Sequence, residues 1–163
     1  MPDYIPDYYQ KSILILGCGN TLFGDDGFGP AAVNYLDKHY KTPAHVAILD
    51  VGTSVREILF NVILAEKKPQ RIIIVDALDC HREPGEIFIA SIEDIPERKI
   101  HDFSVHQTPT INLLKELRDG CELDILIVAV QPEFIPEEVR PGLSDKVQAA
   151  IAPVCDYITR NCF

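Results

Sequence analysis

The sequence has no apolar run that approaches the roughly 20 residues a membrane-spanning helix needs. Its longest apolar runs, at 72–75 and 125–130, have the length of strands. It also lacks an excess of basic residues, because 15 Lys and Arg stand against 25 Asp and Glu and give a formal net charge of −10. This acidic balance argues against nucleic acid or an anionic membrane as the main partner, so we expect neither.

Signals of secretion and of a disulfide framework are also absent. The five cysteines form no C-x-x-C pair, their number is odd, and the chain is too long for a small disulfide scaffold. Residues 1–11 are acidic, contain two prolines and hold no apolar stretch typical of a signal peptide. We therefore expect reduced thiols in a cytoplasmic protein, with 1–11 as a short arm ahead of a single domain at 12–163.

Strand-like and helix-like segments alternate along the domain. Short runs of Ile, Leu and Val predict buried strands, whereas apolar residues at helical spacing predict helices. Glu57 stands in capping-box position to Ser54 at the start of the second helix, and a single last helix is expected from 143 or 144 through Ile158. The alternation predicts an α/β fold, a three-layer domain with a twisted, mostly parallel sheet and helices on both faces. The expected strands are 12–16, 46–49, 71–75, 86–90 (at an edge) and 123–130, and the earlier helices are 31–40, 54–66 and 108–119.

Polar residues cluster directly after the expected strands, where open parallel sheets carry their chemistry. Most of them are carboxylates, and two histidines lie before the helix expected at 108–119. Carboxylates and imidazoles gathered at one edge are typical of a divalent-metal site or a general acid–base site. The candidates are Asn20, Asp25, Asp26, Asp50, Asp76, Asp79, Cys80, His81, His101, Asp102 and His106.

The glycine loop at 17–24 lies between a strand and a helix, which is the setting of a dinucleotide or phosphate site. Leu22 stands where the dinucleotide fingerprint needs its third glycine, and the loop has no lysine for a P-loop. Asp25 and Asp26 would also repel a phosphate at the helix N-terminus. A nucleotide-binding module is therefore the weaker alternative, and the same glycines suit a loop that brings backbone close to a substrate.

Each candidate taken alone also has a structural interpretation. Asp26 is placed to cap or charge-balance the following helix, and His106 to cap a helix or make a local hydrogen bond. Cys18 is either a thiol nucleophile or a small core residue. A metal pair of Cys80 and His81 has no second pair near it in the sequence. Acidic residues at three strand ends together favour a functional site over these separate explanations.

Five sequence blocks follow one another along the chain. They are G-C-G-N-T-L-F-G-D-D-G-F-G from Gly17, D-V-G-T from Asp50, I-V-D-A from Ile74, S-V-H-Q from Ser104 and V-Q-P-E from Val130. In this order they resemble the hydrogenase maturation endopeptidases, which process the large subunit of nickel–iron hydrogenases. The resemblance runs from residue 12 to the last helix and leaves the N-terminal arm outside.

The resemblance implies a single α/β domain that removes a C-terminal extension from the large-subunit precursor of a nickel–iron hydrogenase after nickel has been inserted. It implies Asp26, Asp76 and His106 as the metal-contacting and catalytic residues, with Asp26 where some members of the family carry Glu. The metal is then nickel supplied by the active site of the precursor, which is the expected partner.

Two further alternatives stay open beside the nucleotide-binding module. A nickel-sensing maturation chaperone would share the metal site and bind the precursor without cutting it. A metallopeptidase with its own zinc would favour an H-E-x-x-H helix, which the sequence lacks. No Ser–His–Asp set for covalent catalysis is recognisable either.

Overall fold

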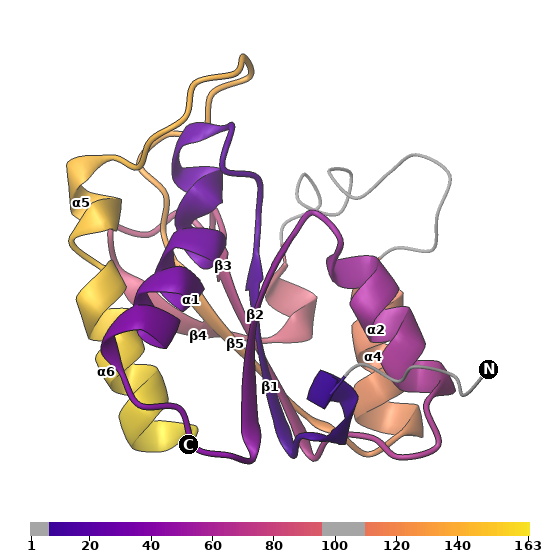
Figure 1. The fold of residues 1–163 in the computed structure, drawn as a ribbon. Coiled ribbons are helices and arrows are strands. Elements are labelled where there is room, and N and C mark those ends of the chain that lie inside the picture. The colour runs from indigo at the N-terminus through magenta and orange to yellow at the C-terminus, as the bar shows by residue number, and fades with distance from the viewer. Residues whose placement is uncertain (1–6, 96–109) are drawn as a thin grey trace.

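The computed structural model of the chain describes residues 7–95 and 110–163 (Figure 1). The start of the predicted arm and the segment that contains His106 lie outside the described residues. Asp7–Gln10 forms a short 3-10 helix, η1, ahead of the first strand. Within the described ranges, no helix combines the length and the apolar content needed to cross a membrane.

The core of the molecule is a five-stranded sheet with the order β2-β1-β3-β5-β4. All neighbouring strands are parallel except β4, which runs antiparallel to β5 at one edge. The mostly parallel sheet and the edge position of the strand predicted at 86–90 are thereby confirmed. The strands are β1 (Ile13–Cys18), β2 (Val46–Gly52), β3 (Arg71–Ala77), β4 (Ile87–Ala90) and β5 (Asp124–Val130).

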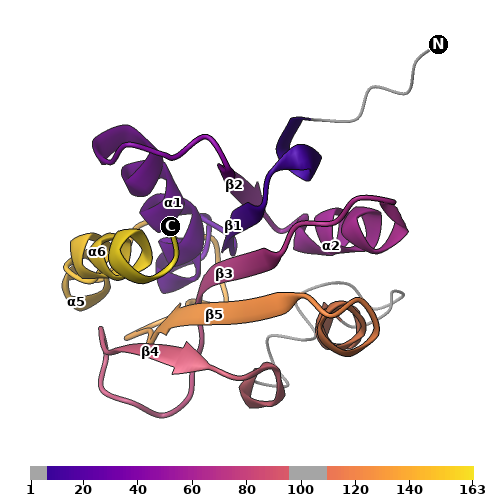
Figure 2. The same ribbon diagram turned by 90° about the horizontal axis from the view of Figure 1, so that it is seen from below.

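Helices cover both faces of the sheet, as Figure 2 shows in the view from below. Successive side chains of a strand point to opposite faces, so Leu14 and Leu16 pack on one helical layer and Ile15 on the other. Strands buried on both faces explain the near-continuous apolar runs of the sequence. One layer holds α1 (Phe28–His39), α5 (Asp145–Gln148) and α6 (Ile151–Asn161), and the other holds α2 (Val55–Leu64), α4 (Thr110–Lys115) and the π-helical turn η4 (Glu116–Gly120).

Two local predictions were wrong. The single last helix is divided into α5 and α6, because Pro153 has no N–H to donate to the carbonyl of Ala149 and its ring would clash there. The capping box between Ser54 and Glu57 is absent: Ser54 is the N-cap of α2, but its side chain makes no cap hydrogen bond. Its φ of −96° and ψ of 17° differ from the extended backbone that directs an N-cap oxygen toward the helix.

The strand order reverses between β1 and β3. From β1 the chain passes through α1 to β2 on one side, and from β2 it returns through α2 to β3 on the other side of β1. The two connecting helices pack on opposite faces of the sheet. Open α/β sheets bind ligands at such a reversal, beyond the carboxyl ends of the two strands concerned. This topology directs attention to the residues that follow β1 and end β3.

Candidate active site

Asp26 lies just beyond β1, in the short 3-10 helix η2 (Gly24–Gly27), and is 7% exposed. Its Oδ2 accepts a hydrogen bond of 2.9 Å from the backbone N–H of Asn20, and its own N–H donates to the carbonyl of Phe23 at 3.0 Å. The turn therefore holds both the main chain and the carboxylate of Asp26. Asp26 is not the N-cap of α1, which is Gly27, so the simple capping interpretation does not hold.

Asp76 lies in β3, next to the last residue of the strand, and is 5% exposed. Its Oδ1 accepts a hydrogen bond of 2.8 Å from the N–H of Ala77. The topology places Asp76 at the strand end beside β1, where the register pairs Gly17 with Val75. Both carboxylates that the sequence singled out at these strand ends are thus buried at the point where the strand order reverses.

Gly19 brings these two residues together. A Cβ at this position would lie 1.9 Å from the carbonyl oxygen of Asp26 and 3.5 Å from Oδ1 of Asp76, and the φ of +132° is rarely adopted by other residues. The N–H of Gly19 donates to the carbonyl of Gly52 at 3.0 Å, which anchors this turn to the end of β2. A side chain at position 19 would collide with the main chain of Asp26, so only glycine allows the loop to lie against Asp26 and close to the carboxylate of Asp76.

Asp25 has a different role from its neighbour, which the sequence did not reveal. Its side chain is fully buried and accepts four hydrogen bonds: from the N–H groups of Glu133 (2.8 Å), Phe134 (3.0 Å) and Ser144 (2.7 Å), and from the Ser144 hydroxyl (2.9 Å). We call these residues the Asp25 cluster. It ties the glycine loop to the loop at 131–144, which follows β5. The donors are more than 100 residues away, so no local pattern could have separated Asp25 from Asp26.

Two other candidates, Asp50 and Asp79, have hydrogen-bond partners on neighbouring elements. Asp50 is exposed, and its Oδ2 accepts a hydrogen bond from Asn34 of α1 at 3.0 Å. Asp79 accepts hydrogen bonds from the side-chain amide of Gln131 at 2.9 Å and from the N–H of His81 at 3.2 Å. Asp50 therefore links β2 to α1, and Asp79 contributes to the shape of the turn that follows β3.

Gln131 shapes the turn that follows β3. It is 5% exposed, and its Oε1 accepts hydrogen bonds from the N–H groups of Cys80 (2.9 Å) and Arg82 (3.1 Å). The same side chain donates to Asp79. In the sequence Gln131 stands in the V-Q-P-E block directly after the last expected strand, and it was not among the candidate residues.

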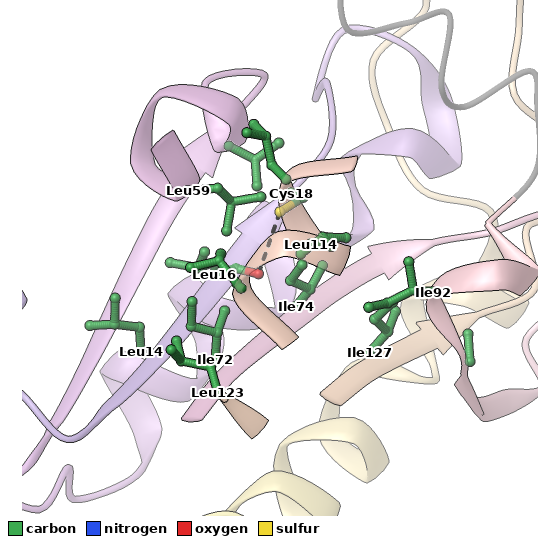
Figure 3. Close-up of a cluster of buried hydrophobic side chains, with 14 of the residues drawn as sticks. Leu14, Leu16, Cys18, Leu59, Ile72, Ile74, Ile92, Leu114, Leu123 and Ile127 are labelled. Atoms are coloured by element: carbon green, nitrogen blue, oxygen red, sulfur yellow. Dashed lines mark hydrogen bonds between the residues drawn. The ribbon is translucent and has the colours of Figure 1, made fainter. Parts of the chain in front are cut away.

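The two cysteine candidates, Cys18 and Cys80, each place their thiol against a main-chain carbonyl. Cys18 is 1% exposed and belongs to the core between the sheet, α2 and α4, where its thiol donates to the carbonyl of Leu16 at 3.7 Å (Figure 3). The thiol of Cys80 donates to the carbonyl of Asp94 at 3.7 Å, and burial raises its pKa. The interpretation of Cys18 as a core residue is confirmed.

The described residues supply two carboxylates to the centre. Among residues 7–95 and 110–163, no group of three or more His, Cys, Asp or Glu side chains is arranged to hold a metal ion. His106, the third residue expected at the site, lies outside the described residues. The pair of Asp26 and Asp76 offers oxygen donors, which can bind a divalent ion or exchange protons with a substrate.

Comparison with known proteins agrees with this architecture. A family model described as hydrogenase maturation protease matches residues 30–161. A Methanocaldococcus jannaschii protein assigned as a hydrogenase maturation protease is 36% identical over 150 residues, which are 91% of this chain and 95% of that protein. The hydrogenase 2 maturation protease of Escherichia coli is 32% identical over 149 residues, which are 90% of this chain and 87% of that protein.

Solved structures of hydrogenase maturation proteases have the same fold. The hydrogenase maturating endopeptidase HybD from E. coli matches with a TM-score of 0.66 and 30% identity, over 90% of this chain and 88% of that one. The [NiFe] hydrogenase maturation protease HycI from Thermococcus kodakarensis matches with a TM-score of 0.71 and 25% identity, over 93% and 91%. The sequence matches span nearly the whole of each relative, and the fold agrees with theirs. The chain belongs to the hydrogenase maturation protease family.

Proposed function

We propose that this protease is an endopeptidase that removes a C-terminal extension from the large-subunit precursor of a nickel–iron hydrogenase, in the cytoplasm and after nickel has been inserted. Family membership supports the general activity. The observation that carries the proposal for the site is the burial of Asp26 and Asp76 against one glycine at the reversal of strand order.

In this proposal Asp26, Asp76 and His106 contact the nickel of the precursor. Two carboxylates and one imidazole form an oxygen and nitrogen donor set that suits Ni²⁺. The hydrogen bond from Asn20 keeps the carboxylate of Asp26 in a fixed orientation. When bound, the metal ion would polarise the scissile carbonyl or activate a water molecule. The protease would then act only on a precursor that already contains its metal.

The test is the intact mass of a purified large-subunit precursor after incubation with this protein, with and without inserted nickel. We expect a nickel-dependent loss of a short C-terminal peptide with the wild-type protein. Asp76→Asn and His106→Ala should abolish the loss while leaving the thermal melt nearly unchanged. Asp37→Asn, at an exposed position of α1, is the matched control and should process the precursor normally.

Three other results would contradict the proposal. An unchanged mass with stable, nickel-dependent binding would identify a non-catalytic chaperone. If the protein neither cuts nor binds a precursor that another maturation protease does cut, the result would favour the alternative of a nucleotide-binding module. A collapsed melt for Asp76→Asn would show that this residue is structural and that the site is wrongly assigned.

A further inference from the structure

Exposed apolar side chains gather on the two loops beside the candidate site. Leu22 in the glycine loop is 48% exposed, and Phe134 and Val139 in the loop after β5 are 56% and 64% exposed. We call these three residues the loop rim. In the described part of the chain the other large, exposed apolar side chains are Phe60 and Leu64 on α2 and Ile89 on the edge strand β4. Half of the large, exposed apolar side chains among the described residues therefore belong to these two short loops.

The two loops form one unit. Phe23 and Arg140 make an isolated parallel bridge, in which the N–H of Arg140 donates to the carbonyl of Leu22 and the N–H of Gly24 donates to the carbonyl of Arg140, both at 2.8 Å. In this register Leu22 lies opposite Val139. In Figure 1 the orange loop after β5 rises beside the start of α1.

The Asp25 cluster fixes the remaining member of the rim. The N–H of Phe134 donates to the carboxylate of Asp25 at 3.0 Å, and the carbonyl of Phe134 accepts from the N–H of Asp25 at 3.3 Å. Hydrogen bonds of the main chain thus fix both loops that carry the apolar side chains of the rim. A surface fixed before binding loses less conformational entropy when a partner binds, so such a rim is suited to bind a peptide.

The rim is also coupled to Asp26. The N–H of Leu22 donates to Oδ1 of Asn20 at 3.0 Å, and the N–H of Asn20 donates to the carboxylate of Asp26 at 2.9 Å. One tight turn therefore carries both an exposed apolar side chain and the candidate catalytic carboxylate. A chain segment bound at Leu22 lies next to whatever group is bound at Asp26.

The charges of the loop restrict what can bind there. Glu133, Glu137 and Glu138 are exposed around Phe134 and Val139, and Arg140 is the one cation among them. With the net charge of −10, this surface repels an anionic lipid or the same surface of a second copy of the chain. It attracts a segment that combines apolar and basic side chains.

We propose that the loop rim is a docking surface for an apolar and basic segment of the large-subunit precursor, separate from the group bound at Asp26 and Asp76. This docking surface rests on the proposed function of the protein as the protease that processes the precursor. The rim contributes affinity for the precursor, and the carboxylates carry the chemistry. Binding energy of this kind is the same in the ground state and the transition state, so its loss changes KM and leaves kcat unaffected.

The experiment measures KM, kcat and the Kd of the nickel-loaded precursor for the rim variants Leu22→Ser and Val139→Ser. Each variant should raise KM and Kd roughly tenfold, because an apolar side chain leaves the interface. Leu64→Ser is the matched control: Leu64 is 66% exposed at the end of α2, close in the chain to the start of β3 and therefore near the amino ends of the strands, whereas the rim lies beyond their carboxyl ends. It should leave both constants unchanged.

The charge requirement has its own pair of variants. Glu138→Gln should weaken binding severalfold at low salt and reduce the salt dependence of Kd, since a charge on the docking surface is removed. Glu66→Gln, at an exposed position just after α2, should change neither. Thermal melts of all variants should match that of the wild type, because these positions are exposed.

The outcomes separate the two proposals. If the wild type cuts the precursor and the rim variants keep wild-type KM and Kd, the docking surface is refuted and the protease function stands. If Leu64→Ser weakens binding as much as Val139→Ser does, the rim is not specific and the proposal is also refuted. If the wild type binds the precursor without cutting it, the proposed function fails while Kd still decides the role of the rim. With neither cutting nor binding, both proposals fail.

Discussion

Replacing Asp25 by asparagine tests how the two loops of the site are joined. The carboxylate has two oxygens, and all four donors of the Asp25 cluster point at them. An amide presents one oxygen and one NH₂ group, so at least one donor must face another donor. If the amide oxygen keeps the Oδ2 position, the N–H of Ser144 loses its acceptor.

The size of the effect follows from these contacts. A buried N–H left without an acceptor costs about 1–3 kcal/mol, and hydrogen bonds to a charged group weaken by about 1 kcal/mol each when that group becomes neutral. Removing a buried charge recovers part of this loss. We therefore expect Asp25→Asn to lower the free energy of unfolding by about 2–4 kcal/mol. Ser144→Ala removes only the hydroxyl bond, leaves the carboxylate with its three N–H donors, and should cost less, about 1.5 kcal/mol.

The measurement is urea unfolding followed by circular dichroism, because the chain has no tryptophan to report by fluorescence. With a slope of about 1–3 kcal/mol per molar urea, Asp25→Asn should lower the midpoint by about 1 M or more. Asp37→Asn serves as the control for the loss of one negative charge. If Asp25→Asn is as stable as Ser144→Ala, the carboxylate does not join the loops and the account of the cluster is wrong.

Three further predictions concern other parts of the site and the core. Gly19→Ala should lower the free energy of unfolding by about 1–3 kcal/mol from backbone strain alone, which urea unfolding measures. It should also displace Asp26 and abolish processing, which the mass of the precursor reports. Gln131→Leu should speed amide hydrogen exchange at Cys80 and Arg82, whose acceptor it removes. Burial raises the pKa of the Cys155 thiol to about 12 from a usual 9.0. Above about pH 9 the thiol is therefore deprotonated in the unfolded state but still protonated in the native state, so the free energy of unfolding should fall as pH rises. Urea midpoints measured between about pH 8 and 10.5 test this.

The layers of the fold could be predicted because their signals are local. Short runs such as the one in β3 mark strands buried on both faces, and their alternation with helical periodicity restricts the sheet to a mostly parallel one. The break between α5 and α6 was missed because the apolar face continues across it. A proline can also stand in the first turn of a helix, so the presence of Pro153 alone did not decide between a continuous and a broken helix.

The site could be predicted only in part. Asp26 and Asp76 follow or end strands that the sequence identified, and the reversal of strand order brings them to one place. Asp25 had the same sequence environment as Asp26, and its role depends on backbone groups of a distant loop. The part assigned to His106 stays a prediction.

The hydrogen bonds around Asp25 have a consequence for how such a protease could change its partner. Three of the four donors are main-chain N–H groups, at 133, 134 and 144, and every residue except proline has one. The side chains at 133 and 134 are therefore under no constraint from the attachment of their own loop. Substitutions there, accumulated in evolution or introduced as a grafted loop, would alter the surface beside the site while the anchoring carboxylate and the catalytic residues stay the same.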